Sequence, residues 1–318
     1  LDDGIDVPSA RLLQIAIREL RATQEEFKRV AMTIDADPVE AWRRIKRRHP
    51  AADELIDVVG GQLQELMTFV RRKGIVTIPE HEPVMVAPTP DFYRRALASV
   101  WVTGPFESKR LPAHYYISQG DPLWSAERQE EHLRDFNFAT LCSISMHEVY
   151  PGHVLHFEHV RQVESPLRKS VLFAPTSFVE GWAHYAEQMM LDEGFERGNS
   201  EVRLGQLAEA LVRLARTVVG IRLHTEDLSV EQGVRFFRDE AYLEETTARQ
   251  EAERGTFDPS YILYALGKQM LLKLRADTEA VEAERFSLRR FHDRLLGQGC
   301  LPLWMHRELM IGSGGLLE

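Results

Sequence analysis

The sequence of 318 residues is long enough for one large domain or two smaller ones, and its 44% hydrophobic and 28% charged residues are typical of a globular protein. Its net charge of −10 argues against a nucleic-acid-binding protein, which usually carries a basic surface. The two cysteines, Cys142 and Cys300, are too few for a disulfide framework, and we expect both to be buried apolar side chains. We find neither an apolar run of about 18 residues nor a signal peptide. We therefore expect a cytoplasmic protein without a membrane span, although the chain begins at Leu1 and not at a methionine.

Helical spacing of apolar residues dominates the N-terminal part of the sequence. It predicts a first helix over residues 10–32. Prolines delimit a second helix over 38–50, and a third over 51–74 ends at Gly74, after two arginines.

Residues 75–125 differ from the rest because prolines and β-branched residues are frequent there. The segment 113–122 has the pattern of a strand followed by a turn, and we expect a small, mostly antiparallel sheet. Helical patterning then resumes and predicts helices over 127–149, 153–163, 176–193, 200–225, 230–252, 259–277, 285–297 and 302–311.

The predicted fold class is therefore mainly α, with one small β segment just before a cluster of histidines. The proline-rich stretch 78–90 marks a candidate boundary between an N-terminal helical segment, 1–77, and a catalytic region, 78–318. It is equally compatible with a loop inside one continuous domain.

The histidine cluster begins with "HEVYPGH", residues 147–153. Zinc hydrolases commonly place two histidines four residues apart on one helical face. Here the spacing is six, which on a continuous helix would put His153 about 120° away from His147. Because Pro151 interrupts a helix and Gly152 accepts unusual backbone angles, we expect a two-residue loop-out that returns His153 to the face of His147. Both histidines are predicted zinc ligands.

The third ligand is predicted from "FVEGWAHYAEQ", residues 178–188. Glu180, His184 and Glu187 lie at i, i+4 and i+7, which places them on one face of a helix. The distance in sequence from His153 allows a turn and an antiparallel return, and Gly181 would let the two helices approach closely. Glu180 is therefore the predicted third ligand.

The remaining polar residues of these segments have secondary roles in the prediction. Glu148 is expected to stay off the metal and act as the general base. A metal-bound histidine usually donates its other ring nitrogen to an acceptor, for which Glu187 is the first candidate and His184 the second. His156 and His159 follow at steps of three and could form an alternative ligand pair, but we favour solvated positions or positions beside the ligands for both.

Three stretches of the sequence resemble the bacterial family known as domain of unknown function 885. They are "HEVYPGHVLH", "EGWAHYAEQ" and "DPSYILYALGKQMLLKLR", and the stretch 291–310 fits as well, so that the resemblance runs from about residue 85 to the C-terminus. That family in turn resembles the gluzincin metallopeptidases, which carry two zinc histidines and a catalytic glutamate on one helix and a third ligand, a glutamate, on the next. The resemblance implies a helical, metallopeptidase-like scaffold. The family often has a polar amide where this chain has His156.

The resemblance also implies a residue that stabilises the oxyanion, since gluzincins commonly use a tyrosine or histidine from a later helix. Tyr264 matches the family pattern best, and Tyr261 lies one turn earlier. His224 and Arg254 are further candidates, for the oxyanion or for a substrate carboxylate.

Gluzincins also bind peptides along an edge strand above the zinc helix. The resemblance therefore implies a substrate-binding strand at 114–118, which contains Tyr116.

These inferences together predict a zinc-dependent metallopeptidase that acts on small peptides, with one zinc ion per chain. Manganese, cobalt or iron could bind the same ligands. Two other functions are compatible with the sequence. One is a metal-dependent hydrolase of a non-peptide amide, an ester or a biosynthetic intermediate, and the other is a non-catalytic helical binding protein with a structural metal. The sequence does not indicate an oligomeric state.

Overall fold

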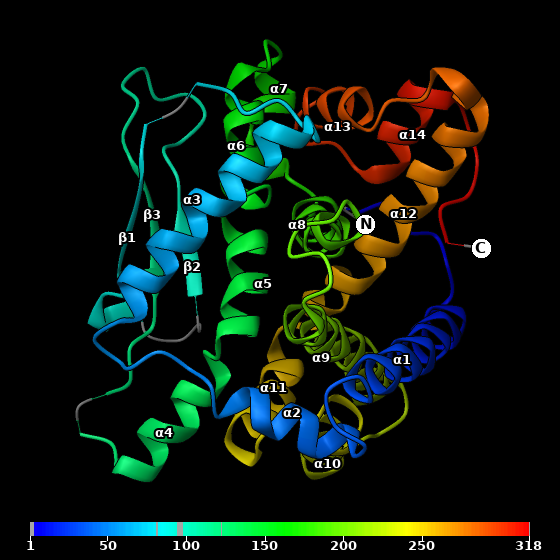
Figure 1. Cartoon of the computed structure of the whole chain (residues 1–318). Helices are drawn as coiled ribbons and strands as arrows, with labels where there is room; N and C mark the ends of the chain where they lie inside the picture. The colour runs from blue at the N-terminus through cyan, green and yellow to red at the C-terminus, as the bar shows by residue number, and fades with distance from the viewer. Residues whose placement is uncertain (1–2, 81, 94–97, 122, 318) are drawn as a thin grey trace.

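Helices form most of the protein, and a small sheet lies at one side of them, as Figure 1 shows. The computed structural model describes residues 3–80, 82–93, 98–121 and 123–317. Its helices are α1 (Ser9–Ala31), α2 (Pro38–Lys46), α3 (Leu55–Lys73), α4 (Ala126–Asp135), α5 (Phe138–Glu148), α6 (His153–Gln162), α7 (Pro166–Lys169), α8 (Thr176–Asp192), α9 (Ser200–Thr225), α10 (Val230–Ala241), α11 (Glu245–Phe257), α12 (Leu263–Glu282), α13 (Leu288–Leu296) and α14 (Leu303–Ile311). The short 3-10 turns are η1 (Asp91–Tyr93), η2 (Val171–Phe173), η3 (Pro259–Ile262) and η4 (Ala283–Arg285). The predicted mainly α class is confirmed.

Two predicted helices are each divided into two. The helix expected over 127–149 breaks at Asn137, whose side chain accepts a hydrogen bond from the backbone N–H of Thr140 and so begins α5. The helix expected over 230–252 ends at Tyr242, which has a left-handed φ of 58°, before α11 begins. In both cases a local capping conformation overrides a continuous apolar pattern.

The sheet consists of β1 (Val84–Pro88), β2 (Ala98–Trp101) and β3 (Ala113–Ile117), in the order β1-β3-β2. β2 runs antiparallel to β3, but β1 runs parallel to it, so the expectation of a mostly antiparallel sheet is wrong for one of the two pairs. Pro122, the last residue of the predicted strand segment, lies outside the described residues. β3 is the central strand and is paired on both sides. The expectation that 114–118 forms an edge strand is therefore wrong, and β2 is the edge strand that packs against α5.

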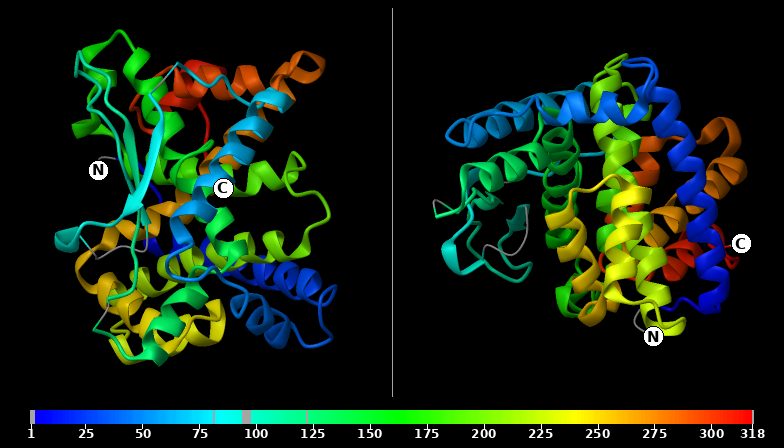
Figure 2. Two further views of the ribbon diagram at one scale, coloured as in Figure 1. Left: turned by 60° about the vertical axis from the view of Figure 1, so that its left-hand side comes forward. Right: turned by 90° about the horizontal axis from the view of Figure 1, so that it is seen from below.

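Two apolar cores hold the helices together. The first gathers side chains of the sheet, α3, α5, α8 and the last three helices. The second lies between α1, α2, α9, α10 and α11. The views of Figures 1 and 2 place the sheet and α1 on opposite sides of the molecule. The first three helices thus contribute to cores shared with later parts of the chain, and the division near residue 77 stays a prediction.

The contact between α8 and α12 is the closest helix crossing near the histidines. A Cβ added to Gly181 would lie 2.6 Å from the backbone carbon of Gly267, and one added to Gly267 would lie 1.9 Å from the carbonyl oxygen of Ser177. Only glycine fits at both positions, as expected for Gly181 as a site of close approach, although its partner is α12 and not α6. Both cysteines are buried and unpaired, as predicted. In the described part of the chain, no helix has the length and apolar character needed to cross a membrane.

Candidate metal centre

The chain breaks between His147 and His153. α5 ends at Glu148, and α6 begins at His153 with Gly152 as its N-terminal cap. The predicted interruption at Pro151 and Gly152 thus takes the form of a break between two helices, close to the predicted helix limits at 149 and 153. A Cβ on Gly152 would lie 1.6 Å from the carbonyl oxygen of His147, so that glycine is required for this tight break. The break nevertheless brings the two imidazole rings together, with centroids 4.8 Å apart and planes at 89°.

Glu180 on α8 completes a cluster with the two histidines. Its Oε2 lies 3.4 Å from Nε2 of His147 and 3.3 Å from Nε2 of His153, and one donor atom from each residue falls within 4.8 Å of the others. Zinc bonds of 2.0–2.2 Å in tetrahedral geometry separate two ligand atoms by roughly 3.4 Å. Oε2 of Glu180 is buried and has no hydrogen-bond partner in the described part of the chain. The three side chains therefore fit a zinc ion.

A buried carboxylate fixes the orientation of the His147 ring. Oε1 of Glu187 accepts a hydrogen bond from Nδ1 of His147 at 2.7 Å, which leaves Nε2 facing Glu180. Glu187 is completely buried; its other oxygen accepts from Ser143 Oγ at 3.1 Å, and Oε1 also lies 3.2 Å from Nη2 of Arg213. Burial alone would lower the pKa of His147, but the neighbouring carboxylates of Glu180 and Glu187 outweigh it and raise this pKa to about 9.

Further ionisable groups surround Glu187. His184, the weaker candidate, lies 3.4 Å from Glu187 and is buried, and the cost of burying its charge holds its pKa well below the usual range. Arg213 and Lys268 are also buried, and burial lowers the pKa of Lys268 to about 8. Sequence reasoning missed both. The available signal was that each interrupts the apolar pattern of a long helix, Arg213 in α9 and Lys268 in α12.

Glu148 and Tyr264, the predicted reactive groups, both lie next to His147. Glu148 is half-buried beside His147 and makes no hydrogen bond or ion pair with the described residues. The ring of Tyr264 stacks on that of His147, with centroids 6.4 Å apart and planes at 8°. Burial and the nearby Glu180 carboxylate raise the pKa of Tyr264 to about 12, so that its phenol stays protonated at neutral pH.

The other candidates from the sequence do not belong to the cluster of three donors and make contacts of their own. His224 Nε2 lies 2.9 Å from the carbonyl oxygen of Gly255, and Tyr261 is fully buried with its ring 5.8 Å from the Arg254 guanidinium. Arg254 pairs with Asp258 at 2.8 Å. It also lies near the hydroxyl of Tyr264, where its charge opposes, without cancelling, the rise in the pKa of Tyr264. These three residues hold α9, α11 and η3 together.

Tyr116 projects from the sheet face opposite its neighbour Tyr115. Tyr115 is fully buried, and its hydroxyl lies 3.4 Å from Ser145 Oγ on α5. Because successive strand residues point to opposite faces, Tyr116 faces away from α5 and packs at right angles on Trp101, with centroids 5.5 Å apart. The structure thus does not bring Tyr116 to the histidines.

His156 and His159 are both buried, so the expectation of solvated positions is wrong. His156 packs against Phe178 at 4.8 Å, and burial holds its pKa well below the usual range. Nε2 of His159 lies 2.8 Å from the carbonyl oxygen of Thr77. Neither belongs to the cluster of three donors.

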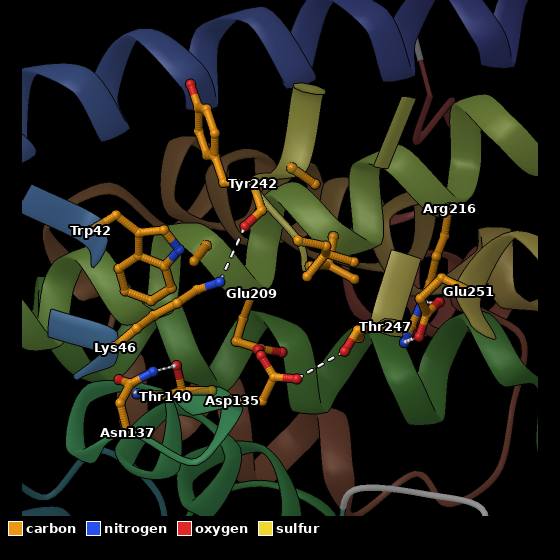
Figure 3. A pocket seen from close by; sticks show the side chains of 14 residues that line it. Trp42, Lys46, Asp135, Asn137, Thr140, Glu209, Arg216, Tyr242, Thr247 and Glu251 are labelled. Atoms are coloured by element: carbon orange, nitrogen blue, oxygen red, sulfur yellow. Dashed lines mark hydrogen bonds and ion pairs between the residues drawn. The ribbon is translucent and has the colours of Figure 1, made fainter. Parts of the chain in front are cut away.

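A hollow of about 540 Å³, its open mouth included, is lined by residues of α2, α9, α10 and α11, among others, and Figure 3 shows its wall. Glu209 in its wall accepts a hydrogen bond from Nη1 of Arg213 at 2.7 Å. Arg216, also in the wall, is paired with Glu251 at 2.6 Å and lies 5.4 Å from the ring of Tyr264. None of the three candidate ligands lines this hollow. It therefore adjoins Arg213 and Tyr264, which contact residues of its wall, and does not include the candidate metal centre.

Comparison with known proteins gives a family and a fold. The profile of a family described as "Bacterial protein of unknown function (DUF885)" matches residues 2–310. The match thus begins with the first helices and not near residue 85, where the sequence motifs placed it. A search of curated proteins gave no match.

Two solved structures share this fold. One, from Shewanella oneidensis, is described as "a putative lipoprotein of unknown function"; at 25% identity it covers 96% of this chain and 57% of its own, with a TM-score of 0.85. The other, "the putative lipoprotein from Colwellia psychrerythraea", is 22% identical and covers 96% and 52%, with a TM-score of 0.84. The chain spans little more than half the length of either protein.

Proposed function

The chain belongs to the DUF885 family of bacterial proteins of unknown function, and we propose that it is a zinc-dependent hydrolase of peptide bonds. The observation that carries this proposal is the buried Oε2 of Glu180, which makes no hydrogen bond within the described residues and lies 3.4 Å from Nε2 of His147 and 3.3 Å from Nε2 of His153. A free carboxylate, Glu148, directly follows the first of these histidines. The resemblance of the motifs to those of gluzincin peptidases supports the same reaction.

The residues divide into ligands and reactive groups. His147, His153 and Glu180 would hold zinc, which when bound polarises a carbonyl and makes water more acidic. Glu148 accepts a proton from the attacking water at its carboxylate and later delivers it to the leaving amine. Since a structural metal site does not need an unpaired carboxylate beside a ligand, Glu148 favours an enzyme over a binding protein.

Tyr264 supplies a hydrogen-bond donor on the side of His147 that its ring covers. With a pKa raised to about 12, its hydroxyl keeps its proton at neutral pH and can donate to the oxygen on which negative charge develops. Arg216, whose guanidinium lies over the ring of Tyr264, helps to hold that ring in place.

The edge strand β2 provides a place for an extended substrate. It packs against α5, which carries His147 and Glu148, and within the described residues it pairs only with β3. A peptide could add to its other edge through backbone hydrogen bonds. This favours a peptide over a compact non-peptide substrate.

The test measures zinc content and hydrolysis in the parent and in Glu148→Gln. We expect about one zinc per chain in both proteins, and a loss of peptide turnover of at least roughly 100-fold in the variant. Equal turnover in the two proteins would rule out the proposed mechanism. Hydrolysis of small amides or esters without hydrolysis of any peptide would assign the site to a non-peptide substrate.

A further inference from the structure

A second hollow lies beside the candidate metal centre. It occupies about 440 Å³, its open mouth included, between the segment after β2, the helix α6 and the turn η2. Its lining residues are uncharged and mostly apolar: Val102, Thr103, Gly104, Pro105, Phe157 and Val171. Such a lining favours an apolar occupant over a charged one.

The hollow adjoins a predicted zinc ligand. Phe157 follows His153 by one helical turn on α6, and the two ring centroids are 6.4 Å apart. Since consecutive residues of an extended peptide are about 3.3–3.6 Å apart, a side chain one or two residues from a bond held at His153 can reach Phe157.

Hydrogen bonds occupy polar groups of the loop that lines the hollow. Arg161, one turn after Phe157, donates to the carbonyl oxygens of Gly104 at 2.6 Å and Glu107 at 3.1 Å. The hydroxyl of Thr103 donates to the carbonyl oxygen of Leu111 at 3.0 Å and accepts from its N–H. These bonds fix the loop after β2, which shares the lining of the hollow with Phe157.

Exposed apolar side chains surround the mouth. Phe106, which follows Pro105 in the loop, is 61% exposed. Its ring lies 6.0 Å from Nζ of Lys169 on α7, so the loop after β2 and α7 lie next to each other. Val171 on η2, which lines the hollow, is 43% exposed. A cluster of exposed large apolar groups is unusual unless it binds something.

We propose that this hollow, which we call the Phe157 pocket, binds an aliphatic or aromatic side chain of the substrate next to the bond that is cleaved. This inference rests on the proposed peptidase function and specifies which substrate side chains the enzyme prefers. Peptides with leucine, methionine or phenylalanine at one position beside the cleaved bond are the preferred substrates. Peptides with aspartate or lysine there are poor ones, because a charge would lose its hydration in an uncharged pocket.

The first experiment profiles cleavage of a peptide library by the zinc-loaded parent and by Val171→Asp. Val171 is exposed, so the change adds a carboxylate to the pocket with little effect on folding. We expect the parent to prefer apolar residues at one position by about tenfold or more, as burial of such a side chain implies. Val171→Asp should lose this preference and gain cleavage of peptides with lysine or arginine there.

Leu172→Asp is the matched control, because Leu172 is the next residue on η2 and does not line the pocket. Its profile should follow that of the parent. A parent without preference at any position, or the same change in both variants, would overturn the proposal.

The second experiment does not depend on catalysis. Binding of 4-fluorotoluene, followed by ¹⁹F NMR, should be seen in the parent and in Leu172→Asp and be lost in Val171→Asp. Binding with this pattern but no cleavage of any peptide would reject the peptidase function and retain an apolar ligand pocket. No binding to the parent, or equal binding to Val171→Asp, would reject the pocket itself.

Discussion

The carboxylate of Glu187 offers the sharpest test of how the protein orders its candidate ligands. In Glu187→Gln the side chain keeps its shape but loses its charge. Nδ1 of His147 can still donate to the remaining amide oxygen, whereas Ser143 and the buried Arg213 lose an ionised partner. The substitution therefore changes the electrostatics around His147 while it preserves the packing.

Two magnitudes follow from this geometry. Loss of a charged acceptor behind a metal-bound histidine typically costs roughly 10–100-fold in metal affinity. Loss of one partner of a buried ion pair typically costs about 3–5 kcal/mol of stability. Because Arg213 keeps Glu209 at 2.7 Å, we expect a value near the lower end, about 3 kcal/mol.

The assays are a zinc titration against a competing chromophoric chelator and unfolding in urea. Glu209→Gln is the matched control, since it breaks the other ion pair of Arg213 without a contact to His147. It should lower stability by less than Glu187→Gln does and keep zinc affinity within about threefold. The same zinc affinity in Glu187→Gln and the parent would refute the orienting role of Glu187.

Three further predictions test the site and its scaffold. Tyr264→Phe should keep zinc and lower kcat by about 100-fold to 1,000-fold, measured with any peptide that the parent cleaves; an unchanged kcat would exclude Tyr264 as the oxyanion donor. Because the pKa of His147 is raised to about 9 in the metal-free protein, its contribution to stability should be complete below about pH 6.5 and be lost as the pH rises through about 9. Zinc must displace that proton, so its affinity should rise by up to about tenfold per pH unit up to pH 9, and a flat profile between pH 7 and 9 would contradict this. Gly181→Ala should lower stability by about 1–3 kcal/mol in urea unfolding because α8 must move from α12, whereas Gly60→Ala, which meets no atom within 4 Å, should raise it by about 0.5–1 kcal/mol.

The cluster of His147, His153 and Glu180 could be predicted because its members lie in short sequence motifs. His147 and His153 are close in sequence, and proline and glycine between them had to change the direction of the chain. The sequence pattern also predicted that a second helix begins at residue 153, where α6 begins. The tight contact of Gly152 with the carbonyl oxygen of His147 required the backbone coordinates.

The residues that support the ligands could not be predicted because they arrive from distant helices. Arg213 comes from α9 and Lys268 from α12, and nothing in the local pattern of either helix indicates which carboxylate it approaches. The order of the strands could not be predicted either, because it also depends on contacts between distant parts of the chain. Whether 113–117 becomes a central or an edge strand depends on where β1 pairs, which involves residues almost 30 positions earlier.

The cost of the buried charges argues that they have a role beyond folding. Glu187, Arg213, His184 and Lys268 lie together in the interior. Apolar residues of similar size often give equal or greater stability than such a group of charges. Apolar residues could not provide the hydrogen bond from Nδ1 of His147 to Glu187, which leaves Nε2 facing Glu180. We therefore interpret this network of buried charges as a means of fixing the imidazole of His147. Because Glu187 is both a member of the network and the acceptor of His147, Glu187→Gln should lower stability and metal affinity together. Glu209 contacts Arg213 but not His147, so Glu209→Gln should lower stability alone.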